Sequence, residues 1–562
     1  MPFRLGGRPG WISDAAYALA GILFLAFCGW KFTLGIGHVL DLRLGDETKY
    51  LSYAIGTDSP ADPAAWSPLY VAFYRFEHLF LSDPIRLYFF HQKLIAALLP
   101  ISLFVYFASR RVPLTIAAAA ATYLMISAAN LPVEPKTMHL ALAIMFLFLA
   151  IFVRLGEHSG RWGLMLAAAA LLSLIRPEYA IAVPGFLLYG LYLVFAVRAR
   201  DRELLSCLAV AAIFTAWLYV HYGFPMAGGR TIFAFAQHFA LNYSAWHHLG
   251  PDPWQSDYRA IYSAVFHDAP SILAAALANP FAFIHHLASN LLHSPLAVTG
   301  LFFAHFNLIL PRFEIYTLME AGLLLAAAIL ALVYFARAGG SSRSSAQATP
   351  GILETLRSLP ETICLAIFLL PFALMMLILY PRNHYVLGFG TVLFALAVVT
   401  LGRRIGDSLT PSRSLAVFAV LVIMVPSLGA TGVRIDVPMG ETSVVPRPAL
   451  QTAYFLRGLE IQSVVRVCAW QTPGPGTYAG DNFRSVSALD KHQGLVQFLA
   501  SEDIGAIVAD DRLRKNPAFY QDPVWLDFQS MPDKFGFAAY PLPDSGGIVV
   551  YVRRDLAALA QH

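Results

Sequence analysis

Long apolar runs recur along the chain and are separated by short polar segments. Runs of roughly 17 to 22 apolar residues have the length of a helix that crosses a bilayer. The pattern predicts eleven such spans, near residues 15–34, 86–108, 112–130, 138–154, 162–175, 179–197, 203–221, 316–336, 361–380, 384–401 and 412–431. The first run is expected to be an uncleaved span, because it is too long for the apolar part of a signal peptide. The predicted fold is therefore mainly α-helical and polytopic in a membrane.

The composition supports this class of protein. Of the 562 residues, 57% are hydrophobic and 13% are charged, whereas soluble proteins carry about 25% charged residues. The net charge of +4 says little about partners, because Lys and Arg gather at the ends of the apolar runs. The cysteines show no spacing typical of a metal site or a disulfide framework, and they are expected to be packing residues. They are Cys28, Cys207, Cys364 and Cys468.

The basic residues predict the orientation, since short cytoplasmic loops are enriched in Lys and Arg. Arg4 and Arg8 precede the first span, so the N-terminus is predicted to be cytoplasmic. The arginines within 110–111, 154–161, 198–202, 337–343 and 403–404 then fall on the same side. An odd number of spans places the C-terminus outside. We expect a multi-pass protein of the cytoplasmic (inner) membrane, with a membrane domain over 1–432 and a periplasmic or extracytoplasmic domain over 433–562.

Three longer segments are predicted on the outer side. The first covers about 35–84, and the second, 221–316, includes amphipathic stretches such as 270–292 that favour interfacial helices. The third has an ordinary soluble composition. Its strand-like runs at 463–467, 504–509 and 547–552, with helical stretches between them, predict a small α/β domain. A Gly/Ser-rich run at 339–347 is expected to be a flexible cytoplasmic linker.

Asp46 and Glu47 lie just beyond the first span. Two carboxylates at a membrane boundary are expensive unless they bind or react with something. If 46–54 is helical, the two side chains point about 100° apart, so only one of them can face a given substrate atom. The other packs or pairs, for example with Lys49. An interfacial helix with a solvated salt bridge is the alternative interpretation.

Glu134 follows the third span and lies on the same predicted side as Asp46. Two carboxylates that meet under one membrane rim could form an acid/base or metal-binding centre. Glu is also common at helix N-termini, which is the structural alternative.

Arginine occurs in two tight outer turns, at Arg176 and at Arg382, and His384 follows the second of them. An outer arginine opposes the positive-inside trend, so a phosphate or carboxylate partner is a reasonable hypothesis. Hydrogen bonds to carbonyl groups or contacts with lipid headgroups are the alternative. The long outer segment adds Arg230 and Arg259 as further candidates. Its histidines have no zinc-site spacing and are more typical of surface or packing positions: His238, His247, His248, His285 and His286.

These motifs resemble those of the GT-C superfamily of membrane glycosyltransferases, both in their order along the chain and in their predicted side of the membrane. The branch with the greatest resemblance contains the bacterial protein-mannosyltransferase-like and lipid A aminoarabinose transferase-like enzymes. The motifs that carry the resemblance are the sequence GDETKY at 45–50, Glu134 with Pro135, the turn at 176–178 and the turn at 381–385. The resemblance covers residues 10 to 432 in topology and implies a GT-C-like fold.

The resemblance implies a sugar donor on polyprenyl phosphate and a lipid, glycan or protein acceptor on the outer side. The first acid after span one would act as the catalytic base or orient the acceptor. The family favours the Asp of such a pair as the base, while this sequence alone does not decide between Asp46 and Glu47. Family members differ in their need for a divalent cation, which Asp46 and Glu134 could bind; no other cofactor and no nucleic acid is expected. The candidate residues are Asp46, Glu47 and Glu134 for catalysis; Arg382, His384, Arg176, Arg230 and Arg259 for the donor phosphate; and Lys49, Tyr50 and Tyr385 for substrate.

The chemistry is consistent with this set. A polyprenyl phosphate is a good leaving group whose charge needs stabilisation, whereas an acceptor hydroxyl needs a base. An inverting displacement then requires one carboxylate and one or two cations. A transporter or flippase is the alternative function, but transporters favour charges at the bilayer midplane in repeated halves. A structural or assembly protein would not need acids and arginines in four outer turns.

Overall fold

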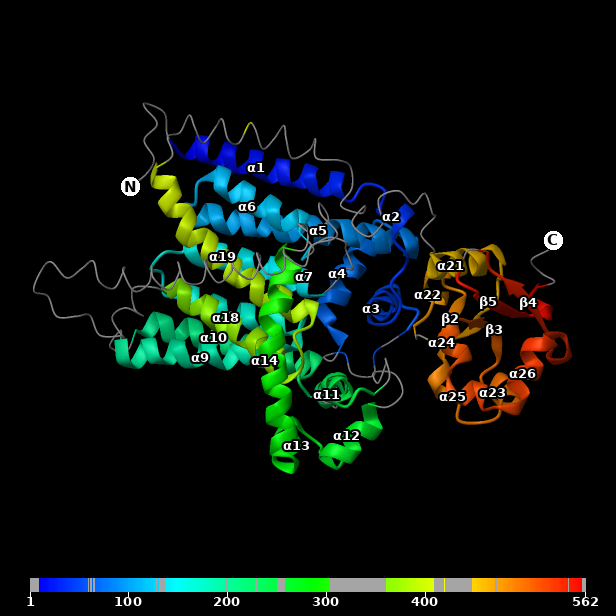
Figure 1. Cartoon of the computed structure of the whole chain (residues 1–562). Helices are drawn as coiled ribbons and strands as arrows, with labels where there is room; N and C mark the ends of the chain where they lie inside the picture. The colour runs from blue at the N-terminus through cyan, green and yellow to red at the C-terminus, as the bar shows by residue number, and fades with distance from the viewer. Residues whose placement is uncertain are drawn as a thin grey trace, which may run out of the picture. The chain divides into compact units, whose positions relative to one another are not determined.

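The computed structural model describes residues 10–58, 60, 63, 66–127, 129–130, 137–197, 201–227, 230–249, 258–303, 360–408, 419, 447–470, 473–543 and 545–557. The chain forms two compact units (Figure 1). Unit 1 comprises Met1–Phe32, Ile95–Pro132 and Lys136–Ala430, and unit 2 comprises Thr33–Leu94, Val133–Pro135 and Thr431–His562. The predicted domain boundary at 432–433 lies outside the described residues.

Within the described residues, seven helical segments are long and apolar enough to cross a membrane. They are Ala16–His38, Pro84–Ser109, Thr137–Arg154, Pro177–Val197, Arg202–Tyr222, Pro360–Ile378 and Asn383–Gly402. Each matches one of the predicted spans, and together they make the chain a multi-pass membrane protein. The predicted spans at 316–336 and 412–431 lie outside the described residues.

The corresponding helices are built from continuous apolar sequence. They are α1 (Gly10–Phe32), α5 (Pro84–Ser109), α7 (Thr137–Arg154), α9 (Ala182–Tyr192) flanked by η2 (Pro177–Ile181) and η3 (Leu193–Val197), α10 (Arg202–Tyr222), α18 (Pro360–Ile378) and α19 (Asn383–Ser408). Large apolar side chains stay exposed on α10, including Val210, Ile213 and Val220. An outward apolar surface is what a helix in contact with lipid tails requires.

Two predicted spans are shorter than expected. Helices α6 (Leu114–Ile126) and α8 (Gly160–Ser173) have 13 and 14 residues. The α8 segment ends early because Arg176 adopts an extended conformation before Pro177, as proline favours in the residue that precedes it. At Gly163 an added Cβ would meet the Cys207 carbonyl oxygen at 2.7 Å, so glycine permits the close packing of α8 against α10.

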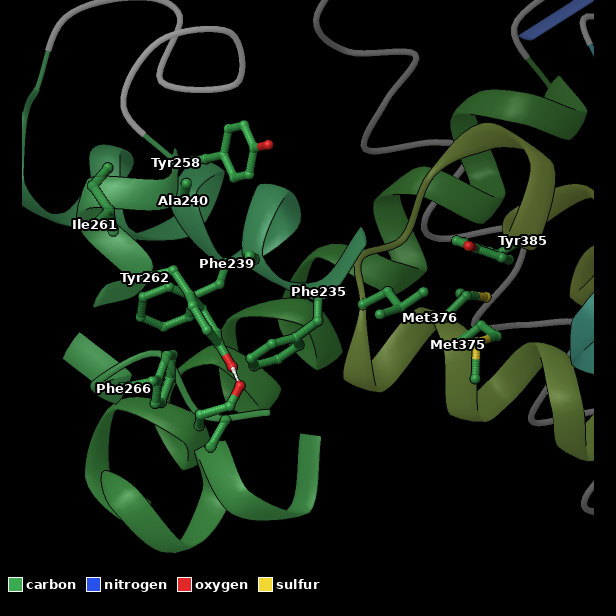
Figure 2. Packing of buried hydrophobic residues seen from close by; sticks show 14 of the residues in the cluster. Phe235, Phe239, Ala240, Tyr258, Ile261, Tyr262, Phe266, Met375, Met376 and Tyr385 are labelled. Carbon is green, nitrogen blue, oxygen red and sulfur yellow. Dashed lines mark hydrogen bonds between the residues drawn. The ribbon is translucent and has the colours of Figure 1, made fainter. Parts of the chain in front are cut away.

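Four further helices of unit 1 come from the second predicted outer segment: α11 (Arg230–His247), α12 (Tyr258–Phe266), α13 (Ile272–Ala278) and α14 (Pro280–Phe303). The helices predicted within 270–292 are present, but α13 and α14 together are apolar enough to count as one broken span, bent by 117°. Asn279 lies at the bend, and its side chain caps α14 by accepting from the Ala282 N–H. Phe235, Phe239 and Phe266 form an aromatic core beside Met375 and Met376 of α18 (Figure 2).

Unit 2 contains α2 (Ile36–Val39), α3 (Asp46–Ile55), α4 (Pro68–His78), the start of α5, and a C-terminal α/β domain. The domain has one five-stranded sheet in the order β2-β1-β3-β5-β4. Its strands are β1 (Val465–Ala469), β2 (Phe483–Ser487), β3 (Ile504–Ala509), β4 (Phe537–Pro541) and β5 (Val549–Arg553). Strand β1 pairs in parallel with β2 and β3, while β5 is antiparallel to β3 and β4.

Both faces of this sheet are covered by helices (Figure 1). Val467 packs with the helix α21 (Pro448–Gly458), whereas its neighbour Cys468 packs on the opposite face with α23 (Leu495–Ser501) and α26 (Pro523–Ser530). The alternation follows from the two-residue period of a strand. The prediction of an α/β tail is confirmed, and the three predicted strands correspond to β1, β3 and β5.

The C-terminal domain is joined to the first predicted outer segment within unit 2. The Asp41 carboxylate accepts hydrogen bonds from the backbone N–H groups of Ala449 (3.0 Å) and Leu450 (2.8 Å) in the first turn of α21. Arg447 at the N-cap position offers no acceptor, so a distant aspartate caps the helix instead. Arg457 also pairs with Asp83 at 2.6 Å. These contacts attach the tail to the segment that carries the acidic motif.

Candidate functional sites

The acidic motif opens the helix α3. Gly45 precedes it with φ 92°, a conformation that L side chains rarely adopt, and Asp46 is the first helical residue. The predicted helix over 46–54 is confirmed, and so is the divergence of the two acids. Asp46 is exposed, whereas Glu47 is 6% exposed. The two carboxylates therefore have different environments, with one open to a substrate and one enclosed by protein.

Two buried tyrosines of α4 hold the Glu47 carboxylate. The Tyr70 hydroxyl donates to Glu47 Oε1 at 2.9 Å, and the Tyr74 hydroxyl donates to the same oxygen at 2.6 Å. Burial and the Glu47 charge raise the pKa of both phenols well above the usual value. Tyr70 and Tyr74 therefore remain protonated hydrogen-bond donors, and they satisfy the buried carboxylate that would otherwise be costly.

The network continues to a second buried acid, which sequence reasoning missed. His91 Nε2 lies 2.8 Å from the Tyr70 hydroxyl, and His91 Nδ1 lies 2.8 Å from Glu77 Oε2. The Tyr74 ring stacks on the His91 ring at 3.6 Å. Burial, followed by the Glu47 charge, raises the pKa of Glu77 to about 8. Glu77 thus carries its proton at neutral pH, which keeps two nearby carboxyls from being charged together.

The sequence held a signal for these residues. Tyr70, Tyr74 and Glu77 are spaced four and three residues apart, so they lie on one face of α4. His91 is an ionisable residue inside a predicted span, and such residues face the protein interior. Neither pattern identifies the partner, because that depends on how α4 packs against the start of α5.

Lys49 and Tyr50, the predicted substrate-binding residues of this motif, contact aromatic rings. Lys49 Nζ lies 3.9 Å from the centre of the Trp66 ring. Tyr50 is buried, with its ring edge-on to Tyr70 at 5.1 Å and to Trp66 at 6.2 Å. These contacts fix the exposed side of α3 around Asp46. A role of either residue in substrate binding, and the pairing of Lys49 with an acid, stay predictions.

The second predicted centre is the turn between α18 and α19 in unit 1. Arg382 is exposed and immediately precedes α19, and its carbonyl accepts from the Tyr385 and Val386 N–H groups, both at 2.9 Å. The His384 ring lies 4.1 Å from the Tyr385 ring. The predicted tight turn is confirmed, and it places Arg382 at the N-terminus of a 26-residue helix.

Three of the four predicted phosphate-binding arginines lie near enough to Tyr385 for their charges to act on it. Arg176 Cζ lies 5.6 Å from the Tyr385 ring centre. The charges of Glu178, Arg176, Arg382 and Arg230 all act on the Tyr385 hydroxyl. We call Arg176, Arg230 and Arg382 the arginine cluster. Glu178 is a carboxylate in the same group and pairs with Arg176 at 2.6 Å.

Arg176 is held in place by the protein itself. Its Nε and one terminal nitrogen donate to Glu178 Oε1 at 2.9 and 2.6 Å, and the other terminal nitrogen donates to the Thr137 hydroxyl at 3.2 Å. Glu178 is buried beside it. On α11, burial and then the Arg382 charge lower the pKa of His238 to about 3, so this histidine adds no charge of its own at neutral pH.

Arg259 has a different setting. It is exposed on α12, and its Nε donates to the Tyr258 hydroxyl at 2.9 Å. With Phe233, Tyr262 and Asp268 it lines an open hollow of about 390 Å³. Asp268 brings a negative charge to the same hollow, so it offsets the charge of Arg259 there.

The predicted metal ligands cannot be assembled into a site from the described residues. Glu134 lies outside them, as does most of the segment around it. In the part of the chain that the structure describes, no three His, Cys, Asp or Glu side chains come together in a manner that could hold a metal ion. Cation binding by Asp46 and Glu134 stays a prediction.

No protein-family model and no curated protein matches the chain. Among solved structures, the chain is similar to the Archaeoglobus fulgidus oligosaccharyltransferase in a crystal structure with a tethered acceptor peptide that contains an NVT sequon. The identity is 13% and the TM-score 0.43, over 97% of this chain and 75% of that one. A second structure of that protein, in complex with Zn and sulfate, gives 14% identity and a TM-score of 0.41, over 95% and 73% of the two chains. Both TM-scores lie below 0.5.

Proposed function

We propose that this protein is a membrane glycosyltransferase. In this proposal it moves a sugar from a polyprenyl-phosphate donor to a lipid, glycan or protein acceptor at the outer face of the cytoplasmic membrane. The observation that carries the proposal is the arginine cluster, in which Arg176 lies 5.6 Å from the Tyr385 ring centre and the charges of Arg382 and Arg230 act on the same tyrosine. Several guanidinium groups at the ends of helices in a membrane protein suit a phosphate that is attached to a lipid chain.

The place of Arg382 supports an anionic ligand. The N-terminus of a helix carries a partial positive charge and unsatisfied N–H groups, so it favours anions. Arg382 adds a full positive charge beside the N-terminus of α19. The guanidinium fork can bind two phosphate oxygens at once, which a lysine cannot do.

The proposed reaction is an inverting displacement. The acceptor oxygen forms a bond to the anomeric carbon while its proton passes to the Asp46 carboxylate. The bond between the anomeric carbon and the phosphate oxygen breaks, and its electron pair stays on that oxygen as polyprenyl phosphate leaves. The arginine cluster stabilises the charge that develops on the leaving group, so that group needs no proton.

We assign the base to Asp46 and a supporting role to Glu47. A base must reach the proton that it removes, and Asp46 is exposed at the start of α3. The Glu47 oxygen Oε1 already accepts two tyrosine hydroxyls inside the protein. Glu47 then fixes the helix that presents Asp46. In this proposal the two acids of one motif have separate tasks.

Label transfer tests the proposal. The purified full chain in lipid nanodiscs is incubated with radiolabelled polyprenyl-phosphate sugars and bacterial membranes, and label is sought in lipid, glycan and protein fractions. We expect transfer by the wild type and its loss in Asp46→Asn and Arg382→Ala, with Arg202→Ala at the start of α10 as the matched control. Unchanged donor recovered from the opposite leaflet of vesicles, without any product, would instead identify a flippase.

Reporter fusions at Ser342 and Ala560 test the predicted orientation. In that orientation Ser342 is cytoplasmic and Ala560 is outside.

A further inference from the structure

The C-terminal end of α18 directly precedes the turn that carries Arg382. The last carbonyl groups of an α-helix have no partner within the helix and must be satisfied elsewhere. Here the carbonyls of Leu377, Ile378 and Leu379 are close to the turn, and Pro381 offers no N–H group that could serve them. Their partners therefore decide how firmly the turn is held.

Two buried side chains of α14 supply these partners. Asn290 Nδ2 donates to the Leu377 carbonyl at 2.8 Å and to the Leu379 carbonyl at 3.2 Å. His286 Nε2 lies 3.0 Å from the Ile378 carbonyl, and since a carbonyl only accepts, Nε2 is the protonated nitrogen. Three consecutive carbonyls are thus bound by one face of a helix about 90 residues earlier in the chain.

Asn242 of α11 orients both of these side chains. Its amide nitrogen lies 2.9 Å from Asn290 Oδ1 and 2.9 Å from His286 Nδ1. The bond to Nδ1 requires that nitrogen to be unprotonated, in agreement with the proton on Nε2. Exposure is 2% for Asn242 and 0% for His286 and Asn290. We call these three residues the amide–imidazole clamp; it is neutral, so it adds no charge to the arginine cluster.

We infer that the amide–imidazole clamp positions Arg382 for the donor phosphate. The inference rests on the proposed function. Only two residues separate Leu379 from Arg382, and the Arg382 N–H is bound to the Tyr380 carbonyl at 2.8 Å. Fixing the carbonyls of α18 thus fixes the backbone from which the guanidinium extends. A bidentate contact depends on direction as well as distance, so a loosened turn weakens it even though the charge remains.

The test separates positioning from general stability. Asn290→Ala removes two donors to the turn, and His286→Phe keeps ring size but removes the donor; His286→Gln restores an N–H at nearly the same distance from the backbone. Asn242→Ala is a milder variant that leaves the direct bonds in place. Ser289→Ala is the matched control, since Ser289 is also buried on α14 and its hydroxyl accepts from the Trp246 ring N–H of α11.

Kinetics of the full chain in nanodiscs give the first measurement. Asn290→Ala and His286→Phe should raise the KM for the polyprenyl-phosphate sugar on the order of tenfold or more, because small displacements of a binding group have effects of this size. The acceptor KM should stay within about twofold, as expected when a remote displacement spares the other substrate. His286→Gln should recover most of the loss, and Ser289→Ala should match the wild type. In an Arg382→Ala background, Asn290→Ala should raise the donor KM no further.

Hydrogen exchange without substrate gives the second measurement and distinguishes the two ways to fail. The amides of 380–386 should exchange faster in Asn290→Ala and His286→Phe than in the wild type or Ser289→Ala. Unchanged exchange, or a donor KM that rises equally in the Arg382→Ala background, would overturn the positioning role while leaving the proposed function intact. If Arg382→Ala itself leaves the donor KM unchanged, the proposed phosphate site fails, and the positioning role fails with it. Should Asn290→Ala not fold, Asn242→Ala must show smaller changes of the same sign in both measurements, and their absence would overturn the inference.

Discussion

The acidic motif of unit 2 and the arginine turn of unit 1 are built alike but differ in electrostatics. In each, an exposed charged residue lies at the start of a helix, and its neighbours are held by a buried polar network. The helix dipole favours the negative charge of Asp46 but opposes the positive charge of Arg382. The dipole thus stabilises a carboxylate at Asp46, whereas the N-terminus of α19 beside Arg382 favours the binding of an anion. This difference is what a base and a phosphate site respectively require.

The two supporting networks differ as well. The network around Glu47 contains two carboxyls and a histidine, together with Tyr70 and Tyr74. The amide–imidazole clamp behind Arg382 consists of two amides and one histidine that donates to a carbonyl. Changes of pH can alter the charge of the first network within the physiological range, because the pKa of Glu77 is raised to about 8. The following variants test whether these differences matter.

Asp46→Asn should have the largest effect. It preserves the shape of the side chain and its place at the start of α3 but removes the base, so kcat should fall on the order of a hundred- to ten-thousandfold. Glu47→Gln should retain more activity, and Asp58→Asn, an exposed acid just beyond α3, should behave as the wild type. Initial rates of label transfer at saturating substrate measure this. Greater loss in Glu47→Gln would reverse the roles of the two acids, and full activity in both would make the motif structural.

Arg382→Ala should come second, with a loss on the order of ten- to a hundredfold in kcat/KM for the donor, the size expected for hydrogen bonds to a charged group. Arg382→Lys should be impaired but less so, because it keeps the charge and loses the fork. Varying donor and acceptor concentrations separately locates the effect. An unchanged donor dependence in Arg382→Ala would move the phosphate site to Arg176, Arg230 or Arg259.

Tyr74→Phe tests the network around Glu47 through stability. The variant removes one of two hydroxyl donors to a buried carboxylate and should lower the free energy of unfolding by about 2 kcal/mol. Tyr454→Phe, at an exposed position on α21, should lower it by less than about 0.5 kcal/mol, as surface substitutions usually do. Thermal unfolding in detergent compares the two. Equal effects would mean that the Tyr74 hydroxyl does not stabilise Glu47.

The sequence predicted the exposed charged residues better than the networks that hold them. Asp46 follows the first apolar span directly, and Arg176 and Arg382 oppose the charge trend of the loops, so a local pattern identifies each of them. The bonds from the clamp to the end of α18 join residues 87 to 92 positions apart, which no local pattern shows. Asn290 and His286 occur in an apolar helix, and the sequence alone does not distinguish a positioning role for them from simple packing.

The fold follows the same division. Continuous apolar runs are sufficient to predict membrane helices. The buried strands β1, β3 and β5 were also predicted from short apolar runs. Strands β2 and β4 were missed because their residues are only partly buried and β4 ends in a proline. Both lie at the edges of the sheet, where one side has no partner strand and the apolar pattern weakens.

The pH dependence of stability should show the smallest effect when it is taken per pH unit, and it concerns Glu77. The pKa of this carboxyl is raised from 4.5 to about 8, first by burial and then by the Glu47 charge. Between these two pH values the folded protein holds a proton that the unfolded chain has lost, so the contribution of Glu77 to stability falls as pH rises, by up to about 1.4 kcal/mol per pH unit. Above about pH 8 both states are deprotonated and the decline ends.

Glu77→Gln, which imitates the protonated acid, should remove this decline. Glu47→Gln should move the upper end of the decline to lower pH, because it removes a neighbouring charge. Unfolding midpoints measured from pH 5 to pH 9 for the three proteins decide it, and parallel curves would show that Glu77 ionises as readily in the folded protein as in the unfolded chain.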